Sequence, residues 1–269
     1  MAIINAIDDI SFSHLRKAGS CVVLTGAGIS AESGIPTFRD AQTGLWSKFN
    51  PQELATPEGF RANPGRVWEW YEYRRCIIKK ARPNPAHYAL ARLESLFLEN
   101  FWLITQNIDG LHAMIGSKNI IELHGNIFRN KCFQCGAPVE LTEKSVSDER
   151  VSSVASSGTR KVEGIPPNCP HCGGCVRPDV VWFNEPLPEE CINKSMELSS
   201  RCNIFFVIGT SAAVYPAAHL PMVAKRGGAY VVEINTDPTP VTDYADFTLL
   251  GKAGEILPEF IKRLEQIKS

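Results

Sequence analysis

The sequence of 269 residues predicts an α/β fold, in which a doubly wound, parallel, Rossmann-like sheet carries a smaller inserted zinc-binding module. The first observation is a set of four short apolar segments: SCVVLT (20–25), FWLIT (101–105), IFFVI (204–208) and AYVVEI (229–234). Such runs are typical of parallel strands buried on both faces. The second is that each run ends in a glycine or polar loop, with helical patterns such as 86–99 between the runs.

The stretch 127–180 interrupts this alternation. It holds paired cysteines and a serine-rich, charged segment (142–164), which we expect to be a flexible surface loop. We therefore expect a large Rossmann-like part and a small zinc module with a helical insertion, within a single domain spanning 1–269. The large part is predicted to cover 15–50, 84–126 and 186–265, and the small part 51–83 and 127–185.

Composition excludes several classes of protein. A hydrophobic fraction of 44% and a charged fraction of 21% are ordinary for a soluble globular chain. The net charge of −1 provides no broad basic field, so direct nucleic-acid binding is not expected. No apolar run is long enough to span a bilayer, and the N-terminus lacks the pattern of a signal or transit peptide. The expected location is cytoplasmic, with no membrane partner.

Four of the nine cysteines form two close pairs, Cys132-x-x-Cys135 and Cys169-x-x-Cys172. Each pair places two thiolates on a tight turn, and two facing turns make a tetrahedral sulfur site for one zinc ion. Four protein ligands leave no open position, so the zinc is expected to be structural. Cys175 follows closely and could be confused with a ligand, but Cys169 and Cys172 repeat the C-x-x-C step and precede Gly173-Gly174, so we expect Cys175 to lie in the core. The alternative is a set of redox-active or unligated thiols. The other four are predicted to be small core residues: Cys21, Cys76, Cys191 and Cys202.

The loop after the first apolar run, residues 26–31 (GAGISA), fits the dinucleotide pattern G-x-G-x-x-G/A. Glycines let backbone N–H groups approach a pyrophosphate closely. The alternative is a tight strand-to-helix turn. Gly34 and Pro36 interrupt the helix that a dehydrogenase would continue, and no clear acidic residue closes a second strand about 20 residues on. The pattern thus favours a dinucleotide without hydride transfer, under an extended loop that carries Phe38 and Arg39.

Ligands of doubly wound sheets bind beyond the carboxyl ends of the strands. The loops GAGIS, TQNID, GTS and NTD are therefore predicted to meet at one crevice.

Six segments follow one another along the chain in this order: GAGISAESGIPTFRD (26–40), TQNIDGLH (105–112), ELHGN (122–126), RPDVVWFNE (177–185), GTS (209–211) and INTD (234–237). Together they resemble the sirtuin family of NAD-dependent protein deacylases, over roughly residues 15–260. The resemblance implies a catalytic domain that consumes NAD as a cosubstrate and acts on acylated lysine side chains of proteins. The products would be nicotinamide, O-acyl-ADP-ribose and free lysine.

The resemblance also implies roles for matching residues. Residues 26–38 would wrap the diphosphate and the nicotinamide ribose, with Arg39 near the phosphates. Gly209, Ser211, Asn235 and the region of Ala253 would hold the adenosine half. The full set of implied cofactor-binding residues is Gly26, Ala27, Gly28, Ser30, Phe38, Arg39, Trp46, Gln106, Asn107, Ile108, Asp109, Gly209, Thr210, Ser211, Asn235, Thr236, Asp237 and Ala253. Val181, Trp182 and Phe183 would line the acyl-lysine tunnel and pair with the substrate backbone.

Three residues are implied to be catalytic. His124 would be the general base that activates a ribose hydroxyl, a task suited to an imidazole whose ordinary pKa is about 6.5. The alternative for His124 is a core histidine bonded to backbone. Asn107 and Asp109 would grip the nicotinamide carboxamide, and the alternative for both is a loop cap or Asx-turn.

Tyr71 and Arg74 are three residues apart in WEWYEYRR (68–75), so on a helix they share one face. The pair looks like the one that marks the desuccinylase and demalonylase subgroup (class III). A guanidinium beside a phenol can bind a distal carboxylate through charge-assisted hydrogen bonds. The alternative is a solvated helix face.

The predicted function is therefore removal of succinyl, malonyl and acetyl groups from lysine. The competing readings are an enzyme that is mainly a deacetylase, a protein ADP-ribosyltransferase, a non-enzymatic NAD sensor and a zinc-ribbon nucleic-acid binder.

Overall fold

The computed structural model describes residues 17–37, 50–141 and 166–268. The chain divides into two compact units. The large unit comprises residues 1–37, 82–123 and 187–269, and the small unit comprises residues 38–81 and 124–186. The interpretation of the whole chain as one catalytic domain stays a prediction.

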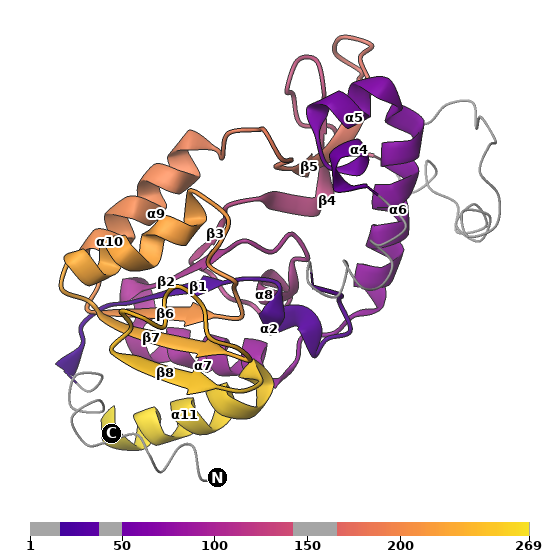
Figure 1. Cartoon of the computed structure of the whole chain (residues 1–269). Coiled ribbons are helices and arrows are strands. Elements are labelled where there is room, and N and C mark those ends of the chain that lie inside the picture. The colour runs from indigo at the N-terminus through magenta and orange to yellow at the C-terminus, as the bar shows by residue number, and fades with distance from the viewer. Residues whose placement is uncertain (1–16, 38–49, 142–165, 269) are drawn as a thin grey trace. The chain divides into compact units, whose positions relative to one another are not determined.

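The large unit is built on a six-stranded sheet in which every pairing is parallel, with the order β3-β2-β1-β6-β7-β8 (Figure 1). The strands are β1 (Cys21–Thr25), β2 (Phe101–Thr105), β3 (Ile120–Glu122), β6 (Ile204–Ile208), β7 (Tyr230–Asn235) and β8 (Phe247–Leu250). The strand order reverses between β1 and β6, which is the switch point of a doubly wound sheet. The predicted fold class is confirmed.

Helices cover both faces of this sheet. They are α2 (Gly28–Ala31), α7 (Pro85–Phe97), α8 (Leu111–Met114), α9 (Glu189–Arg201), α10 (Leu220–Arg226) and α11 (Ala253–Lys268), with short 3-10 turns η3 (Leu98–Asn100) and η6 (Ala217–His219). One core cluster joins the sheet to α7 and α11, and a second joins the other face to α9 and α10 (Figure 1). Strands β1 and β6 are buried along their whole length because both of their faces are covered.

The four apolar runs form β1, β2, β6 and β7, and the helical pattern at 86–99 forms α7. Strands β3 and β8 were not predicted. They are short edge strands, and both are partly exposed. Such strands carry little of the apolar signal that marks a buried central strand.

The small unit contains the helices α4 (Pro51–Leu54), α5 (Pro57–Ala62) and α6 (Pro64–Lys80), and the antiparallel pair β4 (Gly125–Cys132) and β5 (Val176–Val180). An Asn-Pro or Thr-Pro step begins each helix. Asn50, Thr56 and Asn63 accept a backbone N–H of the first turn, and the next residue is proline. Proline has no N–H to lose there and its φ suits the helix, so these steps set where the helices start.

Of the four cysteines expected in the core, Cys21 and Cys202 are buried, whereas Cys76 and Cys191 are half-buried. Cys175 is also half-buried. The predicted loop at 142–164 lies outside the described residues. Among the described residues, none of the helices combines the length and the apolar character that a membrane span requires.

Candidate active site

The carboxyl edge of the sheet brings together the four loops that the sequence predicted to meet. The loops after β1 and β6 contact each other most closely, since the Gly28 N–H donates to the Gly209 carbonyl over 2.8 Å. A Cβ at Gly28 would lie 2.7 Å from that carbonyl oxygen, and Gly209 has a φ of +58°. Both positions therefore require glycine for packing between the two loops, whatever ligand they bind.

Helix α2 is only four residues long and gives way to a turn at Glu32. The predicted interruption after residues 26–31 is confirmed, and a dehydrogenase-like long helix is absent from this position. The residues expected in the loop over the cofactor, Phe38 and Arg39, lie outside the described residues, as does Trp46.

The loops after β1 and β2 are joined by a buried polar cluster. The Asn107 side chain donates to the Gly26 carbonyl (3.1 Å) and to Ser30 Oγ (3.2 Å). Ser30 Oγ donates to Asp109 Oδ2 over 2.8 Å. Asp109 Oδ1 also accepts the Leu111 N–H over 2.9 Å, so the Asx-turn considered as an alternative does form. All three polar side chains are buried, and the cluster holds them at the strand ends.

A second set of contacts links the loops after β2, β6 and β7. The Gln106 side chain donates to Thr210 Oγ1 over 2.9 Å, and the Asn235 side chain donates to the Thr210 carbonyl over 2.8 Å. Ser211, Thr236 and Asp237 continue from these loops and are exposed. Ala253 begins α11 and is buried, and Ile108 is half-buried. The predicted cofactor-binding residues that are described therefore occupy loops after β1, β2, β6 and β7, together with the start of α11.

Two buried histidines support the β2 loop, and neither was predicted from the sequence. His112 Nε2 lies 3.2 Å from Thr25 Oγ1, which donates to Thr105 Oγ1, and Thr105 Oγ1 accepts the Asn107 N–H. The ring of His87, on α7, lies 4.8 Å from that of His112. Among the described residues, His87 Nε2 and His112 Nδ1 have no hydrogen-bond partner.

Burial opposes protonation of both rings. It lowers the pKa of His87 to about 4 and, together with the neighbouring His87, lowers that of His112 to about 3. Both are therefore neutral at pH 7. The Asn84 N–H donates to His87 Nδ1, so the proton of His87 lies on Nε2.

The small unit holds the remaining predicted residues. His124 directly precedes β4, is half-buried, and accepts the Val181 N–H at its carbonyl over 2.9 Å. The Phe183 N–H donates to the Ala55 carbonyl, and the Trp182 N–H donates to Glu185 Oε2. Because these three N–H groups already have partners, pairing with a substrate backbone would use other groups, and it stays a prediction.

Tyr71 and Arg74 share one face of α6, as the spacing predicted. The Arg74 guanidinium lies 5.8 Å from the centre of the Tyr71 ring. Tyr71 is only 3% exposed, and Trp182 Nε1 donates to its hydroxyl oxygen over 2.9 Å. Burial raises the pKa of Tyr71, although Arg74 and the Trp182 bond oppose that shift, so the phenol is protonated at neutral pH. The solvated-face alternative does not hold for Tyr71.

An ion pair holds Trp182 in place. Arg177 donates to both carboxylate oxygens of Glu185, and its guanidinium lies 3.3 Å from the centre of the Trp182 ring. Glu185 also accepts the Trp182 N–H, as above. Both charged residues lie inside the segment RPDVVWFNE (177–185), and the sequence predicted no role for either.

The four predicted zinc ligands form one cluster. Cys132 Sγ lies 3.4 Å from Cys172 Sγ, Cys135 Sγ lies 3.9 Å from Cys169 Sγ, and all four sulfurs lie within 4.8 Å of one another. With a Zn–S bond of about 2.3 Å, a tetrahedron has sulfur separations of about 3.8 Å, so the cluster fits zinc. Backbone N–H groups of Cys135 and His171 donate to Cys132 Sγ and Cys169 Sγ, so two of the four sulfurs are also held by the backbone. The cluster contains four ligands, so the site is structural in type.

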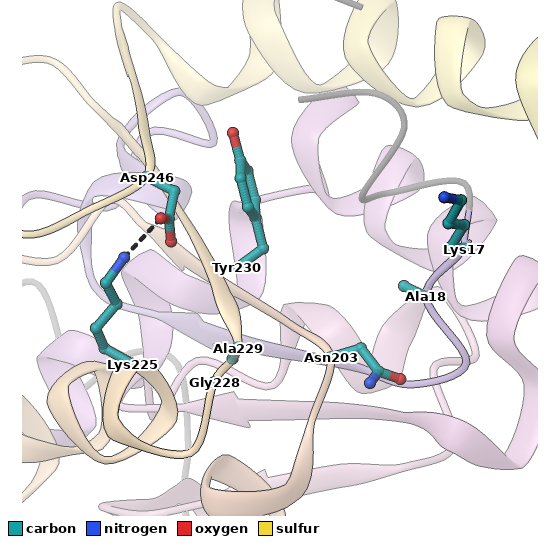
Figure 2. A pocket seen from close by; sticks show the side chains of 8 residues that line it. All are labelled: Lys17, Ala18, Asn203, Lys225, Gly228, Ala229, Tyr230 and Asp246. Carbon is teal, nitrogen blue, oxygen red and sulfur yellow. Dashed lines mark hydrogen bonds and ion pairs between the residues drawn. The ribbon is translucent and has the colours of Figure 1, made fainter. Parts of the chain in front are cut away.

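A cavity of about 440 Å³ lies at the opposite edge of the sheet. Ala18, Asn203, Ala229 and Asp246 line it, just before β1, β6, β7 and β8, and Figure 2 shows Lys225 paired with Asp246 across 2.6 Å. None of the predicted site residues that the structure describes lines this cavity. The candidate chemistry therefore belongs to the carboxyl edge, where ligands of doubly wound sheets bind.

Comparison with known proteins shows which family the chain is similar to. The model of the Sir2 family matches residues 26–216. An NAD-dependent protein deacylase of Aquifex aeolicus is 52% identical over 232 residues, which cover 86% of this chain and 90% of that protein. NAD-dependent protein deacylase 2 of Pyrobaculum aerophilum is 47% identical over 252 residues, which cover 94% of each chain.

Two solved structures are also similar. A Sir2 homolog–NAD complex has a TM-score of 0.83 and 41% identity, over 98% of this chain and 96% of that chain. A Sir2 protein bound to a myristoylated histone peptide has a TM-score of 0.73 and 35% identity, over 96% and 95% of the two chains.

The zinc assignment predicts one zinc ion per chain in the purified protein, measured by elemental mass spectrometry. Cys169→Ser removes a ligand, so the variant should lose most of its zinc and unfold at a lower temperature, because metal binding contributes to the stability of such sites. Cys76→Ser, which changes a thiol outside the cluster, should keep its zinc. Native protein with almost no zinc, or a Cys169→Ser variant with a full complement, would contradict the assignment.

The buried histidines predict a pH dependence of stability. In the unfolded chain a histidine takes up a proton below about pH 6.5, whereas the folded protein keeps both rings neutral down to about pH 4. The free energy of unfolding should therefore fall as pH drops through this window, by about 2 kcal/mol per histidine at pH 5.

Urea unfolding at pH 7 and pH 5 measures this loss. His112→Gln removes one of the titrating groups, so the loss between the two pH values should be smaller than in the wild type. Equal losses in the two proteins would show that His112 does not titrate as described.

Proposed function

This chain belongs to the Sir2 (sirtuin) family, and from that premise we propose that it removes succinyl and malonyl groups, as well as acetyl groups, from lysine side chains. It is an NAD-dependent protein deacylase, since relatives of that name match it at 47–52% identity over at least 86% of its length. The wider acyl range is the part proposed here. A relative that binds a myristoylated histone peptide supports acylated peptides as the substrates for assay.

The observation that carries the acyl assignment is the pairing of Tyr71 with Arg74 on α6. A phenol has one hydrogen, and the Tyr71 oxygen already receives the Trp182 indole N–H. Tyr71 can therefore offer its own hydrogen to an acceptor. The half-buried Arg74 guanidinium at 5.8 Å from the ring adds a positive charge and further donors. A distal carboxylate, as in succinyl-lysine, can accept charge-assisted hydrogen bonds from both groups.

An acetyl group provides no such acceptor. Its methyl end would leave a buried phenol hydrogen facing an apolar group, which costs free energy. The aromatic rings near Tyr71 provide no strong acceptor for the phenol hydrogen. The Trp182 ring contacts both Tyr71 and Phe60, and its indole N–H is a donor. The local chemistry therefore favours an acidic acyl group, although acetyl can still enter.

The loops at the carboxyl edge are proposed to bind the NAD that is consumed. Asn107 and Asp109, which are buried beside Ser30, would hold the nicotinamide carboxamide. As the bond between nicotinamide and ribose breaks, the acyl-lysine carbonyl oxygen bonds to the ribose carbon that nicotinamide leaves. Most of the rate comes from holding these reactants in line.

His124 is proposed as the general base of the following step. It accepts the proton of a ribose hydroxyl, whose oxygen attacks the carbon of the acyl group. The lysine nitrogen takes up a proton and leaves as the free amine, and one water molecule adds to the same carbon, so that the acyl group stays on ADP-ribose as an ester. The backbone of His124 is anchored by the Val181 N–H, which limits the positions that its ring can take.

For the acyl assignment, Arg74→Met should lower the ratio of desuccinylation to deacetylation by about 10- to 100-fold, since a bond to a charged group is lost. The ratio comes from kcat/KM values for matched succinyl and acetyl peptides. Arg66→Met, an exposed change on the same helix, is the control and should keep the wild-type ratio. An unchanged ratio in Arg74→Met would remove the acid-acyl assignment and leave a deacylase without that preference.

For the base, His124→Ala and His124→Tyr should lower turnover by about 10²- to 10⁴-fold, because the ribose hydroxyl loses its proton acceptor. Circular dichroism and the unfolding temperature should stay close to those of the wild type. His219→Ala, at an exposed histidine of η6, should keep full activity. Near-normal turnover in either His124 variant would end its assignment as the base.

A further inference from the structure

A buried carboxylate, Glu233, lies in the middle of β7, and none of the assigned roles uses it. Its side chain is 0% exposed. Among the described residues, its hydrogen-bond partners are three threonine hydroxyls and no cation: Thr239, Thr242 and Thr248. A buried carboxylate without a positive partner costs folding free energy. We therefore expect its hydrogen bonds to hold a part of the backbone that an apolar residue at this position could not hold.

Two of the three hydroxyls belong to the loop that joins β7 to β8. Thr239 Oγ1 donates to one carboxylate oxygen of Glu233, and Thr242 Oγ1 donates to the other over 2.5 Å. The loop is also tied to itself, since the Thr239 N–H donates to Thr242 Oγ1 over 2.9 Å. The third hydroxyl, of Thr248 on β8, lies at 3.4 Å and makes the weakest contact.

This loop needs such an anchor because of its topology. Strands β7 and β8 are neighbours and parallel, and residues 236–246 alone connect them, without a helix. A parallel crossover ordinarily takes about a dozen residues or more and packs a helix on the sheet. Val241 is the one loop residue that is fully buried, and the second half of the loop is held by packing of Tyr244 and Ala245 and by the bonds between Asp246 and Val231. The hydroxyls bound to Glu233 attach the first half of the loop, which leads from the proposed NAD site.

The same loop begins at the proposed NAD site. It starts from Asn235, whose side chain bonds the Thr210 carbonyl, and continues through Thr236 and Asp237, which are bonded to each other. Thr236 also donates its N–H to Asn235 Oδ1 over 2.9 Å. The position of these three residues thus depends on where the 236–246 loop is held.

We propose that Glu233 is a positioning residue for the adenosine half of NAD, which acts by holding the 236–246 loop through Thr239 and Thr242. This inference rests on the proposed function, in which the loops at the carboxyl edge bind NAD, and on the family resemblance, which implies that Asn235 holds the adenosine half. Glu233 itself lies under the loop and touches no substrate.

Four variants test the proposal. Glu233→Gln and Thr242→Val each remove an anchoring hydrogen bond, whereas Thr242→Ser keeps the hydroxyl and Thr248→Val removes only the long contact on β8. The affinity for ADP-ribose is measured by calorimetry, and KM is measured separately for NAD and for an acetyl peptide.

We expect Glu233→Gln and Thr242→Val to weaken ADP-ribose binding by about tenfold and to raise KM for NAD similarly, since one charge-assisted bond is lost. KM for the peptide should change by less than about twofold, and Thr242→Ser and Thr248→Val should match the wild type. If Glu233→Gln fails to fold, the affinities of Thr242→Val and Thr242→Ser for ADP-ribose are compared, and weaker binding by Thr242→Val alone supports the positioning role.

Wild-type affinity for ADP-ribose in folded Thr242→Val, or an equal rise in KM for peptide and NAD, would overturn the positioning role. A wild-type protein that binds no ADP-ribose would instead overturn the proposed function, and this inference with it. The two failures are therefore distinguishable.

Discussion

The contact between the glycine loops after β1 and β6 is the constraint on which the rest of the large unit depends. These strands lie side by side where the strand order reverses, and their loops approach until the Gly28 N–H reaches the Gly209 carbonyl. A side chain at either position would force the loops apart. Their approach is what allows Thr210 to receive contacts from both the β2 and β7 loops. One short backbone contact thereby sets the spacing of four loops.

Around that contact, the protein buries several polar groups. His87 and His112 stay neutral because burial disfavours their charged form. Asp109 and Glu233 accept hydrogen bonds from hydroxyl groups, and the described hydrogen-bond partners of Glu233 include no cation. Such groups contribute less to stability than apolar packing would, yet hydrogen bonds orient backbone turns more specifically than packing does. The carboxyl edge is thus built for the orientation of its loops, and the apolar clusters on both faces of the sheet supply the stability.

Much of this arrangement could be predicted from sequence, because its signals are local. Continuous apolar runs identified β1, β2, β6 and β7, and the two-residue cysteine steps identified the zinc cluster. The pairing of His87 with His112, the bond from Trp182 to Tyr71 and the anchoring of the β7–β8 loop by Glu233 could not be predicted. Most of these contacts join residues far apart in the chain, and a lone His, Trp or Glu in an apolar run carries no periodic signal. The short strands β3 and β8 were not predicted for a related reason. Both are partly exposed edge strands, so their own residues carry little apolar signal.

The central claim is that the loops at the carboxyl edge of the sheet bind NAD and that the enzyme consumes it to release free lysine from acyl-lysine. Mass spectrometry of an acetyl-lysine and a succinyl-lysine peptide, each incubated with the enzyme with and without NAD, tests this most directly. The account predicts that both peptides lose their acyl group only when NAD is present, with one nicotinamide and one acyl-ADP-ribose formed for each lysine released. Peptides that stay intact with abundant NAD, or that lose the acyl group equally fast without it, would contradict the account.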